Sequence, residues 1–366
     1  MAEPSSIASH PSGFLREDIL TEIRMHSTVA EELQQLHPRQ LELIYGNKWF
    51  RMFVPKNLNG LGYTLPEVLR TEEALAWADG STAWVVTLCS GAGWFSGFLN
   101  PKIAAKLFAN ENVCLAGSGA SSGTAEIQDD GYLINGEWKY ASGALHATAF
   151  TANCVITQNG TPVADDEGKP RTRSFIFLRE EVQLSKNWRT MGMVATASHG
   201  FRVERLHVDA NRIFQINNES PALDNVIYRY PFLQLAEATL AVNFSGMAQQ
   251  FIDHCEPVFD RRSNPNLRTN PTEILQQAIA SLTEYRQDFY KAVETSWSFC
   301  SHGQKIPDVV LRQVSNRSHR LYLTSLNLVS TLYPLIGLRA ADPTTEANRI
   351  FRNIFTASQH TLFSQR

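Results

Sequence analysis

The stretch that decides the fold is AGSGASSGTAEIQDDGYLINGEWKYASGALHA, which runs from residue 116 to residue 147. Its part GEWKYAS alternates, so that Trp138, Tyr140 and Ser142 fall on one side of an extended chain. Successive side chains of a strand point to opposite faces, and we therefore predict a strand with two aromatic rings and a hydroxyl on one surface. Two interpretations are open. The rings pack in an ordinary protein core, with Ser142 ending the strand, or they lie against a flat, polar ligand.

Short alternating or β-branched segments surround this stretch between residues 113 and 214. Turn signals such as Asn135-Gly136 and Asn159-Gly160 separate them, which is typical of antiparallel strands. The chain on either side has the apolar spacing of helices, with four helical segments after residue 231. We predict an α+β multidomain protein of three parts: an N-terminal helical domain (residues 1–112), a central antiparallel β-barrel domain (residues 113–222) and a C-terminal four-helix bundle (residues 223–366).

Composition and charge exclude several classes of partner. The 366 residues are 43% hydrophobic and 19% charged, with a net charge of −3, which gives no reason to expect nucleic acid or an anionic membrane as partner. The five cysteines are scattered and never spaced as CxxC, which favours a reduced, cytoplasmic protein over a disulfide framework or a zinc site. The first residues lack a signal-peptide pattern, and no window of 18 uninterrupted apolar residues suggests a membrane span.

Common enzyme motifs are missing from the sequence. AGSGASSGTAE (residues 116–126) resembles a dinucleotide fingerprint, but the spacing of its three glycines is one residue too long and a strand-rich region follows it. There is no GxxxxGK[ST], no GxSxG and no HExxH, and the ten histidines are dispersed without metal-ligand spacing. We therefore expect neither a Rossmann cofactor site nor a metal site.

Five stretches, in order, resemble the acyl-CoA dehydrogenase superfamily, and most closely its two-component flavin-dependent monooxygenases, which act on phenolic or other aromatic substrates. The stretches are FRMFVPKNLNGLG (50–62), EEALAWADGSTAWV (72–85), the stretch 116–147 quoted above, NWRTMGMVATASHGFRVERLHV (187–208) and RIFRNIFTASQH (349–360). The resemblance covers nearly the whole chain and agrees with the helix–strand–helix order read from periodicity. It implies a flavin cofactor, reduced FMN or FAD, supplied by a separate flavin reductase.

The resemblance also implies roles for individual residues. Trp138, Tyr140 and Ser142 would lie along the isoalloxazine ring, with Ser142 at flavin N5, where a hydroxyl can donate or accept in either redox state. His360 would face flavin C4a and the substrate; a neutral imidazole there could take a phenol proton or donate a hydrogen bond to a C4a-hydroperoxyflavin. The alternative is that His360 is an ordinary surface or core histidine. Further cofactor-binding candidates are Gly117, Ser118, Gly123, Thr124, Thr196, Ser198, Arg262 and Thr344.

The sequence departs from the superfamily at two places that keep alternatives open. Asp342 lies near the position of the catalytic glutamate of acyl-CoA dehydrogenases, so an FAD-dependent dehydrogenase with Asp342 as base is one alternative; a turn residue before Pro343 is another. Of the contacts that hold FAD tightly in the superfamily, only Gly337 remains, and Arg261 or Arg262 could still hold a phosphate; these losses suggest loosely bound flavin or a scaffold that has lost it. The resemblance further implies a homotetramer and a small-molecule substrate.

Overall fold

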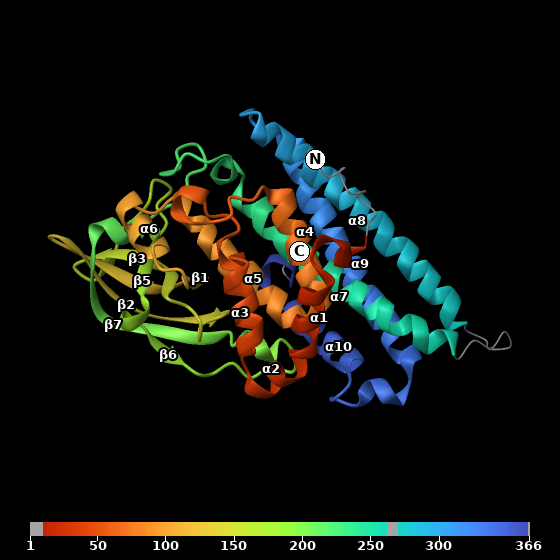
Figure 1. Cartoon of the computed structure of the whole chain (residues 1–366). Coiled ribbons are helices and arrows are strands. Elements are labelled where there is room, and N and C mark those ends of the chain that lie inside the picture. Colours follow the sequence, from red (N-terminus) through yellow and green to blue (C-terminus); the bar gives the residue numbers. More distant parts are fainter. Residues whose placement is uncertain (1–9, 262–269, 365–366) are drawn as a thin grey trace.

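The computed structural model describes residues 10–261 and 270–364. A sheet occupies one side of the molecule and long helices the other, with the helix α5 between them (Figure 1). The helices that precede the sheet are α1 (Glu17–Met25), α2 (Ser27–Leu33), α3 (Pro38–Gly46), α4 (Leu65–Ala78), α5 (Gly80–Trp94) and α6 (Pro101–Phe108).

The starts of α4 and α5 follow from the local sequence. The Thr64 hydroxyl accepts a hydrogen bond from the Glu67 N–H, and the Glu67 carboxylate accepts one from the Thr64 N–H, which is a reciprocal capping box. The Asp79 carboxylate accepts a hydrogen bond from the Thr82 N–H at 2.8 Å and thereby caps the start of α5. Helix α5 carries no charged residue and is almost wholly buried, as expected for a helix packed on all sides.

The central region forms one sheet. Its strands are β1 (Leu115–Gln128), β2 (Gly131–Ala141), β3 (Ala149–Gln158), β4 (Thr161–Pro162), β5 (Thr172–Leu178), β6 (Gln183–Ser185), β7 (His199–Asp209) and β8 (Ile213–Phe214). The order is β6-β7-β2-β1-β3-β5-β8, and β4 pairs with β3. The turn at Asn159-Gly160, between β3 and β4, lies where the sequence predicts it.

The prediction of an antiparallel barrel is wrong, because the sheet is mixed and is not closed. Strands β1 and β3 run parallel, with Leu115 opposite Ala149, whereas the other pairs are antiparallel. The connection from Ser142 to Thr148 carries the chain from β2 across to the far edge of β1, so β3 does not pair with β2 in sequence. Asn135-Gly136 is also not a turn: it lies inside β2, at a shift in the register between β2 and β7.

Four long helical segments follow the sheet, as the sequence predicts. They are α7 (Phe232–Asp260), α8 (Pro271–Ser301), α9 (Asp308–Ile336) and α10 (Glu346–Ala357), and the short α11 (Thr361–Ser364) comes after them. Helix α7 packs against α4 so closely that a Cβ at Gly246 would overlap the backbone of α4. One continuous apolar core therefore joins the helices before and after the sheet, and a second core lies within the sheet.

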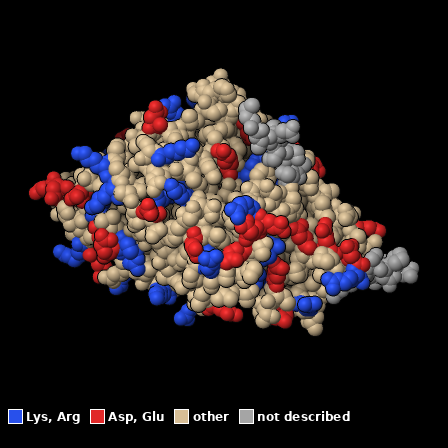
Figure 2. Space-filling model, in the orientation of Figure 1, with Lys and Arg blue, Asp and Glu red and all other residues tan. Residues whose placement is uncertain are grey.

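Charged side chains of both signs are interspersed over the face of the molecule shown in Figure 2. This distribution agrees with the near balance of acidic and basic residues in the sequence. Among the described residues, no helix combines the length and the apolar character that a bilayer span requires.

Candidate active site

Three hydroxyl groups from separate segments form a buried chain at the end of the sheet. Ser142 follows the last residue of β2, Thr196 ends the 3-10 helix η6 (Val194–Thr196), and Ser198 precedes β7. The oxygens of Ser142 and Ser198 are 2.8 Å apart, and those of Ser198 and Thr196 are 2.7 Å apart. The Thr196 hydroxyl also donates a hydrogen bond to the Met193 carbonyl at 2.7 Å. The sequence therefore named three residues that the fold brings into direct contact.

The expectation that Trp138, Tyr140 and Ser142 share one face is wrong. The pairing of β2 with β7 shifts register after Trp138, and Tyr140 has a left-handed backbone with φ of +67°. Trp138 is consequently buried in the sheet core, stacked on Phe201 at a centroid distance of 5.3 Å, and has no exposed surface for a ligand. Tyr140 turns outward, is 66% exposed, and lies edge-on to Trp188 at 5.7 Å.

His360 immediately precedes the short helix α11. Its Nδ1 accepts a hydrogen bond from the Leu362 N–H at 3.4 Å, so the hydrogen of the neutral ring belongs on Nε2. Burial lowers the pKa of His360, which keeps the imidazole neutral near pH 7. Its ring lies edge-on to Trp84 of α5, with centroids 5.9 Å apart. Within the described part of the chain, Nε2 has no hydrogen-bond partner and is the free donor of the ring.

Helix α5 packs against both the Ser142 turn and His360. A Cβ on Gly143 would lie 2.8 Å from the Cys89 sulfur and 3.2 Å from Val85, so the turn after Ser142 approaches the helix as closely as a glycine allows. Trp84, which touches His360, is the residue before Val85. The predicted N5 residue and the predicted catalytic histidine therefore approach neighbouring turns of one helix.

The loop between β6 and β7 is fixed to helix α10, which leads to His360. A Cβ on Gly192 would overlap the backbone of α10 at Arg352. The Asn353 side-chain oxygen accepts a hydrogen bond from the Met193 N–H at 2.6 Å. Asn353 thus holds the loop that carries Thr196 and Ser198, a role that the sequence did not reveal.

The four candidates on β1 make contacts within the sheet. A Cβ at Gly117 would overlap β3, and one at Gly123 would overlap the ring of Trp138, so both positions need glycine for close packing. Ser118 donates a hydrogen bond from its hydroxyl to a backbone carbonyl of β2 at 2.8 Å, and Thr124 does the same at 3.4 Å. The four residues thus form two pairs on one strand, and these contacts account for the residue type at each position.

Asp342 lies in an exposed turn between η9 (Leu338–Ala341) and α10. Its carboxylate accepts hydrogen bonds from the Thr344 N–H at 2.9 Å and from the Thr344 hydroxyl at 2.7 Å, which lower the pKa of Asp342. A carboxylate engaged in an exposed turn is poorly placed to take a proton from a buried acyl chain. Arg262 lies outside the residues that the structure describes.

His146 is a polar residue of the site region to which the sequence assigned no role. It lies in the turn after Ser142 and Gly143, and its Nε2 is buried with no hydrogen-bond partner among the described residues. Burial lowers the pKa of His146 to about 4. An unpartnered buried nitrogen is costly, so a water or a ligand atom is expected to meet it.

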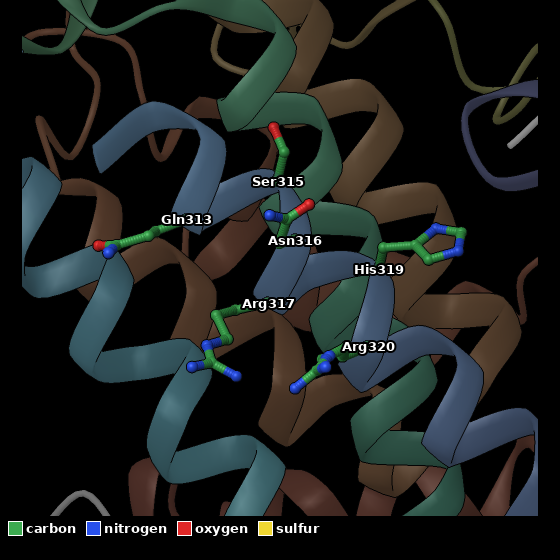
Figure 3. A pocket seen from close by; sticks show the side chains of 6 residues that line it. All are labelled: Gln313, Ser315, Asn316, Arg317, His319 and Arg320. Atoms are coloured by element: carbon green, nitrogen blue, oxygen red, sulfur yellow. The ribbon is translucent and has the colours of Figure 1, made fainter. Parts of the chain in front are cut away.

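A hollow of about 590 Å³ lies on the surface of α9. Figure 3 shows its lining side chains spreading from one helix rather than converging on a point; they are Gln313, Ser315, Asn316, Arg317, His319 and Arg320. Within the described ranges, no group of three or more His, Cys, Asp or Glu side chains could hold a metal ion.

The curated proteins similar to this chain are monooxygenases and hydroxylases, although no family model matches the chain. Indole-3-acetate monooxygenase of Pseudomonas putida is 27% identical over 354 residues, which cover 93% of this chain and 88% of that protein. The oxygenase subunit HsaA of a flavin-dependent monooxygenase from Rhodococcus jostii is 24% identical over 63% of this chain and 60% of its own length.

Solved structures share the fold over nearly the whole chain. The HsaA monooxygenase from M. tuberculosis superimposes with a TM-score of 0.86, at 20% identity, over 97% of this chain and 93% of its own. The Streptomyces protein XiaF, solved in complex with FADH2 and glycerol, has a TM-score of 0.82 at 17% identity over 96% of this chain and 93% of its own.

Proposed function

This chain is a homologue of the oxygenase components of two-component flavin-dependent monooxygenases, and we propose that it hydroxylates an aromatic or similar small substrate with reduced flavin supplied by a separate reductase. The observation that carries this proposal is the packing of the Ser142 turn and of His360 against the same helix, α5. The Ser142 hydroxyl, as a contact for the cofactor, and the neutral imidazole of His360, as a contact for the substrate, are thereby both close to the apolar helix α5.

The residues at the end of the sheet fit a flavin. Ser142 would meet the ring edge, and the exposed ring of Tyr140, backed by Trp188, would lie along it. The unpartnered Nε2 of His146 supplies a further polar atom in the same turn. The β1 candidates Gly117, Ser118, Gly123 and Thr124 belong to the proposal as a second edge. When bound, reduced flavin supplies the electrons that activate dioxygen.

The substrate would lie on the Nε2 side of His360, with α5 as one apolar wall of its site. His360 is neutral and presents Nε2–H, so it can orient an oxygen atom of the reactants by donating a hydrogen bond. Trp84 fixes one side of the imidazole, and the uncharged α5 excludes water from this wall. The chain's own residues therefore bind, orient and keep the site dry.

The proposal is tested by mixing the protein with reduced FMN or reduced FAD, admitting 18O-labelled dioxygen, and analysing a panel of phenols and indoles by mass spectrometry. We expect one labelled oxygen in a hydroxylated product. His360→Ala should still bind flavin and lose most of the product. If no product carries the label and reduced flavin is oxidised only with reduction of dioxygen to hydrogen peroxide, hydroxylation is refuted. Anaerobic bleaching of bound FAD by an acyl-CoA would instead support the dehydrogenase alternative.

The oligomeric state, compartment and domain layout are further parts of the proposal. We propose a homotetramer in the cytoplasm, with the three-part division into residues 1–112, 113–222 and 223–366. The apolar character of α7 does not support the tetramer, because α4 and α9 cover this helix within the chain. Phe232, Leu233 and Leu323 on the long helices are partly exposed, and contact with a second copy of the chain would bury them. Light scattering measures the state directly.

A further inference from the structure

The buried chain of hydroxyls from Thr196 to Ser142 has a fixed direction. The Met193 carbonyl can only accept, so the Thr196 hydroxyl must give its single hydrogen to that carbonyl at 2.7 Å. Thr196 then has only lone pairs for Ser198, and Ser198 must be the donor of the 2.7 Å bond between them. By the same reasoning, Ser142 must donate to Ser198 at 2.8 Å.

The consequence falls on Ser142, the open end of the chain. Its hydrogen is committed to Ser198, so toward any ligand its oxygen presents lone pairs alone. Thr196 and Ser198 are 1% and 2% exposed, so water does not compete for their hydroxyls. This differs from the expectation that the Ser142 hydroxyl serves equally as donor and as acceptor.

We propose that Thr196 and Ser198 are positioning residues that hold Ser142 as an acceptor and so make the site select the reduced over the oxidised form of flavin. Reduced flavin carries a hydrogen on N5, whereas oxidised flavin presents a lone pair there. An acceptor oxygen therefore attracts the N5–H of the reduced form and repels N5 of the oxidised form. The inference rests on the proposed function, with Ser142 beside N5.

The preference for reduced flavin is limited, because the hydrogen bonds of the chain can also run in the opposite direction. Reversing the chain would let Ser142 donate outward, at the cost of the hydrogen bond from Thr196 to the Met193 carbonyl. That carbonyl would keep the Trp188 indole N–H as a donor, at 2.9 Å. The cost of reversal is thus about one buried hydrogen bond, and we expect the chain to favour reduced flavin by roughly three- to tenfold.

The test is the ratio of two dissociation constants, one for oxidised FMN by fluorescence quenching and one for dithionite-reduced FMN by anaerobic titration. Thr196→Val removes the hydroxyl and keeps the shape, and it should lower the preference for reduced FMN by roughly three- to tenfold. Thr196→Ser keeps the hydroxyl and should restore the ratio. Thr190→Val is the matched control in the same loop, since the Thr190 hydroxyl bonds only to the Gly192 carbonyl at 2.7 Å.

Ser198→Ala breaks the chain at its centre and should lower the ratio as Thr196→Val does, which covers the case in which the valine variant does not fold. An unchanged ratio in both folded variants would overturn the inference and leave the proposed function standing. Equal affinity of the parent protein for both redox forms would also overturn it. Failure to bind FMN and FAD in either form would instead overturn the proposed function itself.

Discussion

Glu72 and Glu73 are consecutive residues of α4, both without exposed surface, and their surroundings shift their pKa values in opposite directions. Burial alone would raise the pKa of Glu73, but the charge and hydrogen bonds of Arg286, at 2.7 and 2.9 Å, together with the Tyr290 hydroxyl at 2.8 Å, outweigh it and lower that pKa. Burial raises the pKa of Glu72 well above its usual value, and the hydroxyl of Ser90 at 3.3 Å offsets this only in part. Burial therefore favours the neutral acid form of Glu72, whereas Arg286 favours the carboxylate form of Glu73.

Replacing Glu72 with glutamine should stabilise the protein above neutral pH. The folded pKa of Glu72 lies above the unfolded one, so the unfolded chain loses the proton first and stability falls as the pH rises above the usual glutamate value. Each unit by which the folded and unfolded pKa values differ corresponds to ~1.4 kcal/mol of unfolding free energy. Relative to the parent, we expect Glu72→Gln to be stabilised by at least about 1 kcal/mol more at pH 8 than at pH 5. Urea unfolding at both pH values measures this. Glu284→Gln, on an exposed position of α8, is the control, and a loss of stability in Glu72→Gln at pH 8 would contradict the neutral assignment.

The same substitution at Glu73 should have the opposite effect. Glu73→Gln leaves the Arg286 guanidinium buried without its carboxylate, which costs about 3–5 kcal/mol. The double variant with Arg286→Met should recover part of this loss, because it removes the uncompensated charge. Urea unfolding of the two variants and the parent completes the comparison. A loss below about 1 kcal/mol in Glu73→Gln would argue against a charged pair.

The helices could be predicted from the sequence more fully than the sheet. Apolar spacing and caps such as Thr64 and Asp79 are local signals, and they locate α4 and α5 correctly. Alternation reveals the faces of a strand but not its neighbours. The parallel pairing of β1 with β3 depends on the path of residues 142–148, where no periodic pattern records the direction of the chain.

The candidate site was predictable in part for the same reason. Alternation assumes an unbroken strand, and neither glycine nor proline marks the register shift between Trp138 and Ala141. Helix caps are recognised at Ser, Thr, Asp and Asn, whereas here the Nδ1 atoms of His10, His37 and His360 accept the capping hydrogen bonds. The orientation of the His360 ring was therefore hidden from motif reading.

Gly143 should be intolerant of alanine beyond the cost of its backbone conformation. Its φ is +74°, and the new Cβ would lie 2.8 Å from the Cys89 sulfur. Gly168 has a similar φ of +77° with open space around it, so Gly168→Ala measures the backbone cost alone. We expect Gly143→Ala to cost about 1–3 kcal/mol more than Gly168→Ala in urea unfolding, with weaker flavin binding as Ser142 shifts. Equal destabilisation of the two variants would show that α5 shifts to make room for the new Cβ.

His146 should make the protein sensitive to mild acid. Its pKa is lowered to about 4 by burial, so between pH 6.5 and pH 4 the unfolded chain binds a proton that the folded chain does not. Stability is thus lost as the pH falls through this window. Between pH 7.5 and pH 5, the free energy of unfolding of His146→Gln should fall by about 1–3 kcal/mol less than that of the parent. His302→Gln, at an exposed position after α8, is the control, and an unchanged pH dependence in His146→Gln would mean that the ring is hydrated.

Replacing His360 with two different amides should separate donation by Nε2 from proton abstraction. The amide nitrogen of glutamine reaches the position of Nε2, whereas that of asparagine reaches only the position of Nδ1, which here accepts from Leu362. If Nε2–H is a hydrogen-bond donor, His360→Gln should keep roughly tenfold more hydroxylation than His360→Asn or His360→Ala, because the loss of one such bond corresponds to about 1 kcal/mol or more. Product formation per reduced flavin consumed is the measurement.

Because burial lowers the pKa of His360, the parent should also keep its turnover as the pH falls to about 6.5, the usual histidine value. Equal loss in the glutamine and alanine variants would identify His360 as a base instead.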